Sequence, residues 1–170
     1  SGNNLSSEYI GNQFPVAQVF GRETYHVNEL YVQEAIEGIF SVKAGRLCGG
    51  NDFLASPFYA KYVSNALCGN PISIFFNVPF TAQPNATWGT YISFKPHKSL
   101  LIKNAIYNAN RYISENKYHG MNFTFDRTEG ALLMTEWAYL LHRMSLPGNY
   151  KIGAYYTTGT FKRFIEGKQK

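Results

Sequence analysis

Apolar and polar residues alternate in paired segments, and this feature constrains the fold of the chain more than any other. The stretch WGTYISFK, 88–95, has two faces, with Trp88, Thr90, Ile92 and Phe94 on one and Gly89, Tyr91, Ser93 and Lys95 on the other. A period of two residues is typical of a β-strand with one apolar face. Because Pro96 cannot donate to a β-ladder, PHKS predicts a tight turn and residues 100–108 predict a returning strand. The adjacent Lys103 and Asn104 leave open which of the two faces inward.

Two more segments repeat this hairpin pattern. The turn is SLPGN in residues 130–161 and lies around Glu37 and Gly38 in residues 26–47. The apolar face of the later hairpin comprises Leu133, Thr135, Trp137, Tyr139 and Leu141, followed by Tyr150, Ile152, Ala154 and Tyr156. In the earlier hairpin, Glu34 shares the face of Leu30, Val32 and Ile36 and is an exception to the pattern. We therefore expect about six strands in three hairpins within a single unit, 1–170.

The connections between the expected strands differ at the two ends. The turns EG, PHKS and SLPG are short, whereas Leu47 to Ala86 and Asn108 to Glu129 are long. Short turns on one side and long loops on the other are typical of transmembrane β-barrels, whose apolar residues face lipid while polar residues line water. The predicted fold class is all-β: an antiparallel up-and-down meander that is part of such a barrel. Soluble sandwiches and lipocalin-like barrels also alternate, so periodicity alone leaves them open.

Charge and motifs argue against several other classes. The net charge is +5, but Lys and Arg are scattered apart from a small cluster in FKRFIEGKQK, so we expect no nucleic-acid partner. Apolar runs such as ALLM and ISIFF are far shorter than the roughly 20 residues of a spanning helix. The four histidines show no metal-binding spacing, and there is no GxSxG elbow or phosphate loop. The sequence predicts no catalytic residue, no metal and no cofactor.

The long connection, 48–85, carries the one helix that the sequence predicts. Ser56 suits an N-cap and Pro57 the first helical position, while Gly69 and Pro71 end the segment, so we expect a helix over about 56–67. Cys48 and Cys68 bound this segment. A disulfide between them would indicate an oxidising compartment, and two free thiols are the alternative.

An ordered series of motifs resembles a known family. The segments are SPFYAKYVSNALCGNP, PNATWGTYISFKP, YHGMNF, MTEWAYL and LPGNYKIGAYY, together with GNQFPVAQVFG and the strands ending in AGRL. In this order and spacing they resemble the carbohydrate-selective porin (OprB-like) family of Gram-negative outer membranes, over nearly the whole chain. Where members of that family carry a cysteine after SP-x-Y, this chain has Ala60, so the resemblance supports no family-type disulfide within the helix segment.

The resemblance implies a polar-lumen β-barrel in the outer membrane that passes sugars by diffusion. Porins with an aqueous channel have about 16 to 18 strands, whereas this sequence predicts about six. The chain thus resembles an internal portion of such a porin or the product of a truncated gene, and we expect this partial chain alone not to conduct. Its expected partners are sugars, outer-membrane lipid, and either the missing strands or other copies of the chain at the two sheet edges.

The candidate residues for binding sugar or lining the pore combine charged, amide and aromatic side chains. Arg46 is the preferred single candidate, because a guanidinium offers five fixed donors to vicinal hydroxyls and Arg46 lies where a strand enters the long loop. The full set adds Glu29, Lys43, Lys95, Glu136, Lys151 and Tyr155 on presumed inner faces, and Tyr59, Lys61, Tyr62 and Asn65 on the predicted helix. In a porin this helix would lie against the polar wall of the sheet.

Two other functions compete with the channel. A soluble or secreted β-barrel or sandwich could bind a carbohydrate or a small apolar ligand. Two of Glu29, Glu34 and Glu136 could form the carboxylate pair of a glycoside hydrolase, but such pairs must lie about 5 to 10 Å apart, which a sequence does not show. The sequence therefore favours a channel over an enzyme.

Overall fold

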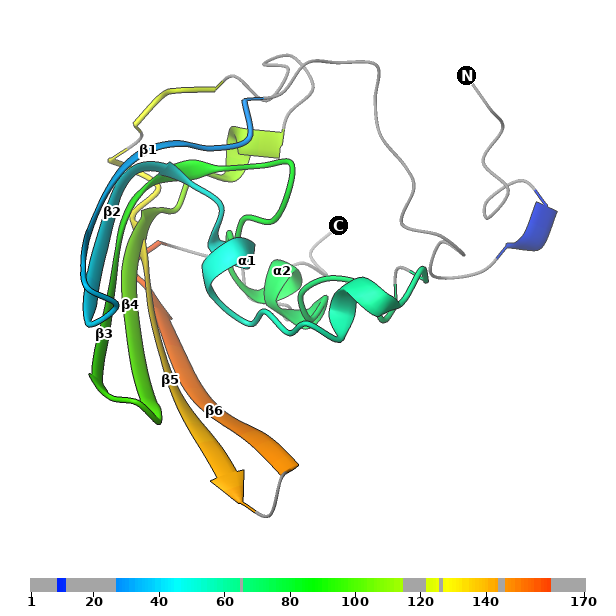
Figure 1. The fold of residues 1–170 in the computed structure, drawn as a ribbon. Helices are drawn as coiled ribbons and strands as arrows, with labels where there is room; N and C mark the ends of the chain where they lie inside the picture. Colours follow the sequence, from blue (N-terminus) through cyan, green and yellow to red (C-terminus); the bar gives the residue numbers. More distant parts are fainter. Residues whose placement is uncertain are drawn as a thin grey trace.

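The computed structural model describes residues 9–11, 27–64, 66–114, 122–125, 127–143 and 146–159. Six antiparallel strands form one sheet in which every strand pairs with its neighbour in sequence (Figure 1). The strands are β1 (Leu30–Ile36), β2 (Phe40–Leu47), β3 (Thr87–His97), β4 (Leu100–Asn108), β5 (Ala131–Arg143) and β6 (Leu146–Thr157). This open meander confirms the fold predicted from the alternation.

Strand lengths and sheet edges both fit a piece of a larger barrel. β3, β4, β5 and β6 contain 11, 9, 13 and 12 residues, close to the roughly 9–11 residues that a tilted strand needs to cross a bilayer. Within the described residues, β1 and β6 each pair with one strand only. Since unpaired edges attract further strands, this sheet needs additional strands on both sides to close.

The strand register sorts the side chains onto two faces of different chemistry. We call the face that carries Lys43, Lys103 and Glu136 the inner face, and these residues share it because Lys43 pairs with Tyr91 and Lys103 pairs with Glu136. The opposite, outer face exposes large apolar side chains: Leu30, Val32, Ile36, Ile92, Phe94, Ile106, Leu133, Trp137, Tyr139, Tyr150, Ile152 and Tyr156. Soluble proteins rarely expose so large an apolar patch, so the outer face has the composition of a lipid-facing wall.

The register also resolves the ambiguity at Lys103 and Asn104. Lys103 pairs with Glu136 on the inner face, and Asn104 pairs with Thr135 on the outer face. The short β1–β2 turn contains Glu37 and Gly38 as predicted, and both have positive φ angles, 35° and 70°. The turn expected at SLPGN, 145–149, is wrong, because Leu146–Asn149 already belong to β6 and pair with residues 140–143 of β5. Residues 144–145, between the two strands, lie outside the described residues.

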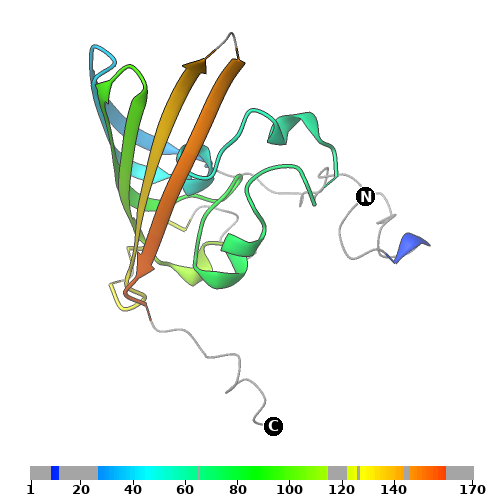
Figure 2. The ribbon, with the colours of Figure 1, turned by 90° about the horizontal axis from the view of Figure 1, so that it is seen from below.

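The long connection between β2 and β3 lies over one end of the inner face, next to the point where the connection leaves β2. Figures 1 and 2 show it on the concave side of the sheet. Its Phe53 contacts two tyrosines edge to face, with ring centroids 5.9 Å from Tyr91 and 6.4 Å from Tyr107. Gly89 permits this packing, because a Cβ there would lie 2.5 Å from Cδ1 of Tyr107. The core is therefore built between the sheet and its own loop, and consists of Leu47, Phe53, Ile74, Val78, Phe80, Tyr91, Ala105, Tyr107, Leu132 and Met134.

The helix expected over about 56–67 is wrong. The connection contains the short helices α1 (Gly49–Asp52) and α2 (Ser73–Asn77), and the predicted segment contributes only the 3₁₀ turn η2 (Tyr59–Lys61). A second short turn begins at Ser64, whose carbonyl accepts hydrogen bonds from the amides of Leu67 and Cys68. The side chains of Phe58, Tyr62 and Val63 are 64%, 51% and 67% exposed, so no apolar face is buried. A helix this short is marginal without such burial, and serine competes for local hydrogen bonds.

Another short helix, η3 (Arg111–Ser114), follows β4. Among the described residues, no helix combines the length and the hydropathy needed to cross a membrane.

Candidate functional site

Four charged side chains meet on the inner face just below the apolar core. We call them the charged wall: Lys43 on β2, Lys103 on β4, Glu136 on β5 and Lys151 on β6. The cross-strand register brings Lys103 opposite Glu136, and Lys151 follows on the next strand, paired with Ala138. Residues separated by up to 108 positions in sequence thus form one polar surface because they share one face of one sheet.

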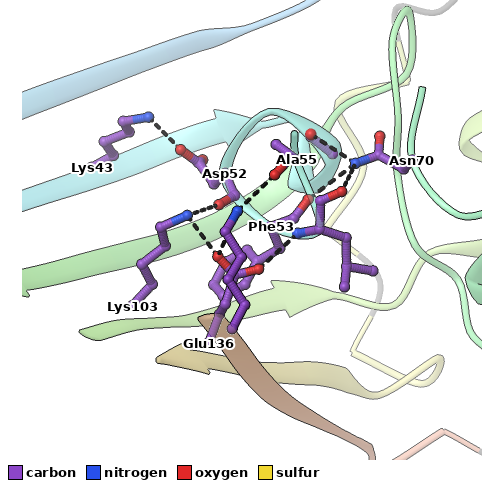
Figure 3. A network of polar contacts seen from close by, with 10 residues as sticks. Lys43, Asp52, Phe53, Ala55, Asn70, Lys103 and Glu136 are labelled. Atoms are coloured by element: carbon purple, nitrogen blue, oxygen red, sulfur yellow. Dashed lines mark hydrogen bonds and ion pairs between the residues drawn. The ribbon is translucent and has the colours of Figure 1, made fainter. Parts of the chain in front are cut away.

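The charged wall holds a short piece of the long connection, residues 52–55, which we call the pinned segment (Figure 3). Nζ of Lys43 lies 2.7 Å from Oδ1 of Asp52. Nζ of Lys103 donates to the carbonyl of Asp52 at 2.7 Å, and Nζ of Lys151 donates to the carbonyl of Ala55 at 2.7 Å. The backbone amide of Leu54 donates to Oε2 of Glu136 at 3.0 Å. Side chains on four strands therefore hold the pinned segment against the inner face, three of them through its backbone.

Two residues outside the wall fix the rest of the loop. The side-chain amide of Asn70 donates to the carbonyls of Gly50, Phe53 and Leu54 at 3.0, 3.0 and 3.3 Å. The carboxylate of Glu29 accepts from the backbone amide of Cys48 and the side chain of Asn51, both at 2.8 Å. Glu29 thereby sits at the start of α1, where the free amides of a helix N-terminus favour a carboxylate.

Glu136 is the centre of the electrostatic network. Glu136 is 3% exposed, and its Oε1 lies 2.9 Å from Nζ of Lys103 and 3.8 Å from Nζ of Lys151. Removing one partner from a buried ion pair leaves an uncompensated charge, which is strongly destabilising. Three lysines against the carboxylates of Asp52 and Glu136 give this cluster a formal charge of 3 − 2 = +1.

Aromatic rings flank one of these cations. Nζ of Lys43 lies 5.4 Å from the ring centroid of Tyr31 and 5.0 Å from that of Tyr91. Both tyrosines share the inner face with Lys43 through the register. The inner face thus combines cations, carboxylates and ring faces, which are groups that hydrogen-bond hydroxyls and contact apolar ring surfaces.

The structure brings only some of the predicted residues together. Lys43, Glu136 and Lys151 meet in the charged wall, and Tyr155 lines a neighbouring cavity of about 250 Å³ with Phe53 and Leu54. Glu29 anchors α1 instead. Lys61 and Tyr62 are exposed away from the wall, Lys95 is exposed next to the β3–β4 turn, and Asn65 lies outside the described residues. The expected contact of Lys61 and Tyr62 with the sheet is replaced by contact through residues 52–55.

Arg46 lies apart from the charged wall. It pairs with Leu30 and Trp88, which places it on the outer-face side of β2. Its guanidinium carbon lies 4.7 Å from the ring centroid of Phe123 and it donates to the carbonyl of Asn122. The indole of Trp88 donates to the carbonyl of Phe123 at 2.8 Å. Because Arg46 is 1% exposed and holds residues of the later long loop, we leave it out of the proposed lining.

Sequence reasoning missed Asp52, Lys103 and Asn70. Asp52 and Asn70 belong to the long connection, where no period indicates which side chains face the sheet. Lys103 could have been assigned from the alternation of β4, because Tyr107, Ala105 and Lys103 are two residues apart and therefore share a face, whereas Asn104 lies on the other.

The two cysteines are free thiols, so the disulfide candidate is wrong. Cys48 is fully buried, with Sγ 3.8 Å from the carbonyl of Thr81. Cys68 is half-buried and lines a cavity elsewhere in the loop. Each sulfur therefore has its own environment.

These environments predict unequal thiol reactivity. Burial raises the pKa of the Cys48 thiol to about 11, so at pH 8 it stays protonated and is not nucleophilic. In the folded protein, iodoacetamide at pH 8 should alkylate Cys68 in a Cys48→Ser variant and leave Cys48 unmodified in a Cys68→Ser variant, as read by mass spectrometry. In urea, which unfolds the protein, the two cysteines should be alkylated at equal rates. Fast labelling of Cys48 in the folded protein would contradict the described burial.

A sheet with an apolar outer face and a charged inner face that holds its own loop has the architecture of a porin β-barrel wall. The chain belongs to the OprB family of carbohydrate-selective porins, whose family model matches residues 1–169.

Individual relatives agree with this assignment. The chain is 28% identical over 167 residues to Porin B of Pseudomonas aeruginosa, covering 93% of this chain and 36% of that protein. It is 24% identical over 159 residues to the putative porin QuiX of Acinetobacter baylyi, covering 89% of this chain and 35% of that protein. The high-pH structure of Pseudomonas putida OprB superposes with a TM-score of 0.80 at 24% identity, over 94% of this chain and 39% of that one. The chain therefore spans little more than a third of these relatives.

Proposed function

We propose that this chain is part of a passive channel through which sugars cross the outer membrane of a Gram-negative bacterium. The observation that carries the proposal is the difference between the two faces of the sheet. The outer face offers lipid an apolar surface centred on residues such as Ile152, which is 75% exposed. The inner face carries the charged wall and the pinned segment.

The pinned segment supports a mechanism of restricted diffusion. A loop fixed to the inner wall narrows a barrel lumen, and its fixed charges and carbonyls give a passing sugar short-lived hydrogen-bond partners. Weak binding at several groups allows a solute to enter and to leave. We propose no chemical reaction, no cofactor and no metal for this channel.

The partners follow from the same surfaces. The outer face would contact membrane lipid, and the free edges of β1 and β6 would pair with the further strands that complete the barrel or with other copies of the chain. For this reason the partial chain alone is not expected to conduct.

Conductance measurements test the function directly. The full-length porin that contains this chain, reconstituted in planar bilayers, should show an ion conductance that falls in a saturable way as glucose is added. The isolated chain 1–170 serves as the comparison and should form no stable pore. A full-length protein with a stable pore but no response to any sugar would overturn the proposal.

A further inference from the structure

The long connection also lines a half-open cavity of about 810 Å³, which we call the loop cavity and which the charged wall does not use. The side chains that matter for its chemistry are Asn51, Ser56, Tyr59, Asn70, Phe76 and Gln83. Its size falls within the roughly 300–1,000 Å³ of small-molecule sites. Ala55 lines it as well, so the cavity adjoins the pinned segment at the residue whose carbonyl accepts from Lys151.

The lining of the loop cavity is uncharged. None of its described lining residues is Lys, Arg, His, Asp or Glu, although the charged wall is close by. A charged solute would lose hydration there without gaining a counter-ion, which is costly. The cavity therefore suits a neutral ligand.

Aromatic side chains supply apolar contact surface. Tyr59, Phe75 and Phe76 line the cavity, and Phe76 is 76% exposed. A phenylalanine exposed to that extent contributes little to the hydrophobic core, so core packing does not explain why Phe76 stands at this position. Rings exposed next to amide groups suit a ligand with both C–H faces and hydroxyls.

The hydrogen-bond network leaves acceptor oxygens in the cavity lining. The Glu29 carboxylate can only accept hydrogen bonds, so the side-chain NH₂ of Asn51 donates to it. The side-chain oxygen of Asn51 then accepts a hydrogen bond from Nε2 of Gln83 at 3.1 Å. This order leaves Oε1 of Gln83 without a protein donor among the described residues. The amino group of Asn70 is likewise directed to three carbonyls, which leaves its Oδ1 as an acceptor.

Gly50 maintains the position of Asn70. A Cβ at residue 50 would lie 2.4 Å from Oδ1 of Asn70 and 3.1 Å from Cβ of Ala82. Any larger side chain there would displace the Asn70 amide, so the cavity wall depends on glycine at this position.

We propose that the loop cavity is a binding site for a neutral sugar, separate from the charged wall. The proposal rests on the proposed function, since it names where in the channel the sugar is held. The rings of Phe76 and Tyr59 contact the apolar face of the sugar, and the oxygens of Gln83 and Asn70 accept its hydroxyl protons. The absence of charge from the described lining selects neutral sugars over sugar acids.

Matched substitutions in the full-length porin test this site. Phe76→Ala should raise the glucose concentration for half-maximal block of the bilayer current by about 3- to 10-fold, because an aromatic contact contributes roughly 0.5–1.5 kcal/mol. Gln83→Ala should raise it as well. Phe58→Ala is the control: Phe58 lies in the same loop, is 64% exposed and does not line the cavity, so its half-block concentration should match the unmodified porin.

The outcomes separate this proposal from the one before it. The open-pore conductance of the Phe58→Ala control should match that of the unmodified porin, since Phe58 lies outside the core, and gluconate should block the unmodified porin less well than glucose. Glucose block that is the same in Phe76→Ala, Gln83→Ala and the unmodified porin would overturn the sugar site while leaving the channel intact. An unmodified porin that glucose does not block would instead overturn the proposed function.

Discussion

Replacing Glu136 with alanine is expected to release the pinned segment from the sheet and to give the largest functional change in this molecule. The substitution removes the acceptor for Nζ of Lys103 at 2.9 Å and for the amide of Leu54 at 3.0 Å. It also leaves Lys103 without its ion-pair partner, with only the carbonyl of Asp52 as an acceptor. Breaking a buried ion pair typically costs about 3–5 kcal/mol, so the free energy of unfolding in detergent should fall by roughly that amount.

The same substitution should change the current through the full-length porin. Loss of one carboxylate raises the formal charge of the cluster from +1 to 3 − 1 = +2, and the reversal potential in a salt gradient should shift toward anion selectivity. A loosened segment should also increase single-channel conductance. Glu136→Gln, which keeps the shape, should change selectivity with a smaller loss of stability.

Glu34→Ala is a suitable control for Glu136. Glu34 is an exposed carboxylate on the opposite face of the sheet and forms no ion pair with another described residue. Its removal should leave unfolding and conductance close to the unmodified values. If Glu136→Ala behaved like Glu34→Ala in both measurements, the pinned segment would not depend on the charged wall.

Ile152→Arg should prevent insertion of the porin into the membrane. Ile152 lies near the middle of β6, is 75% exposed, and pairs with Trp137 on the outer face. An arginine on the lipid face near the bilayer midplane costs about 2–4 kcal/mol. The folded, heat-modifiable band on a gel of reconstituted protein should fall several-fold, and the yield in the membrane fraction with it.

Two further substitutions distinguish the effect of lipid from general disruption of β6. Asn149→Arg adds the same charge on the inner face of the same strand, where Asn149 is exposed and pairs with Leu140, and folding should be retained. Ile152→Ala removes apolar area without adding charge and should cost less than Ile152→Arg. Equal losses for the two arginine variants would show that the outer face does not contact lipid.

Prediction from sequence succeeded for the sheet because its side chains obey a fixed period. In a strand, adjacent residues face opposite sides, so the alternation around Ile92 and around Trp137 fixed the outer face before any pairing was known, and the register confirms it. The short turns at Glu37 and at PHKS then set the order of the strands. The same period could have assigned Lys103 to the inner face.

The 48–85 connection has no comparable periodicity, and the helix predicted in it was wrong. Capping signals at Ser56 and Pro57 suggested a helix, but a helix of that length needs a surface on which to bury one side, and Tyr62 and Val63 find none. The loop is instead organised by contacts with distant residues: Lys151 with Ala55, 96 positions away, and Glu136 with Leu54, 82 positions away. No local pattern encodes such contacts.

The sequence by itself determined the strands, their order and the apolar face, since each depends on neighbours within a few residues and on a period of two. Only the tertiary structure decided which loop residues meet the inner face and where an uncharged cavity lies. Both features depend on the packing of the 48–85 connection, whose residues 52–55 are held by four strands at once. Packing of that kind balances many long-range contacts, and a linear sequence does not display them.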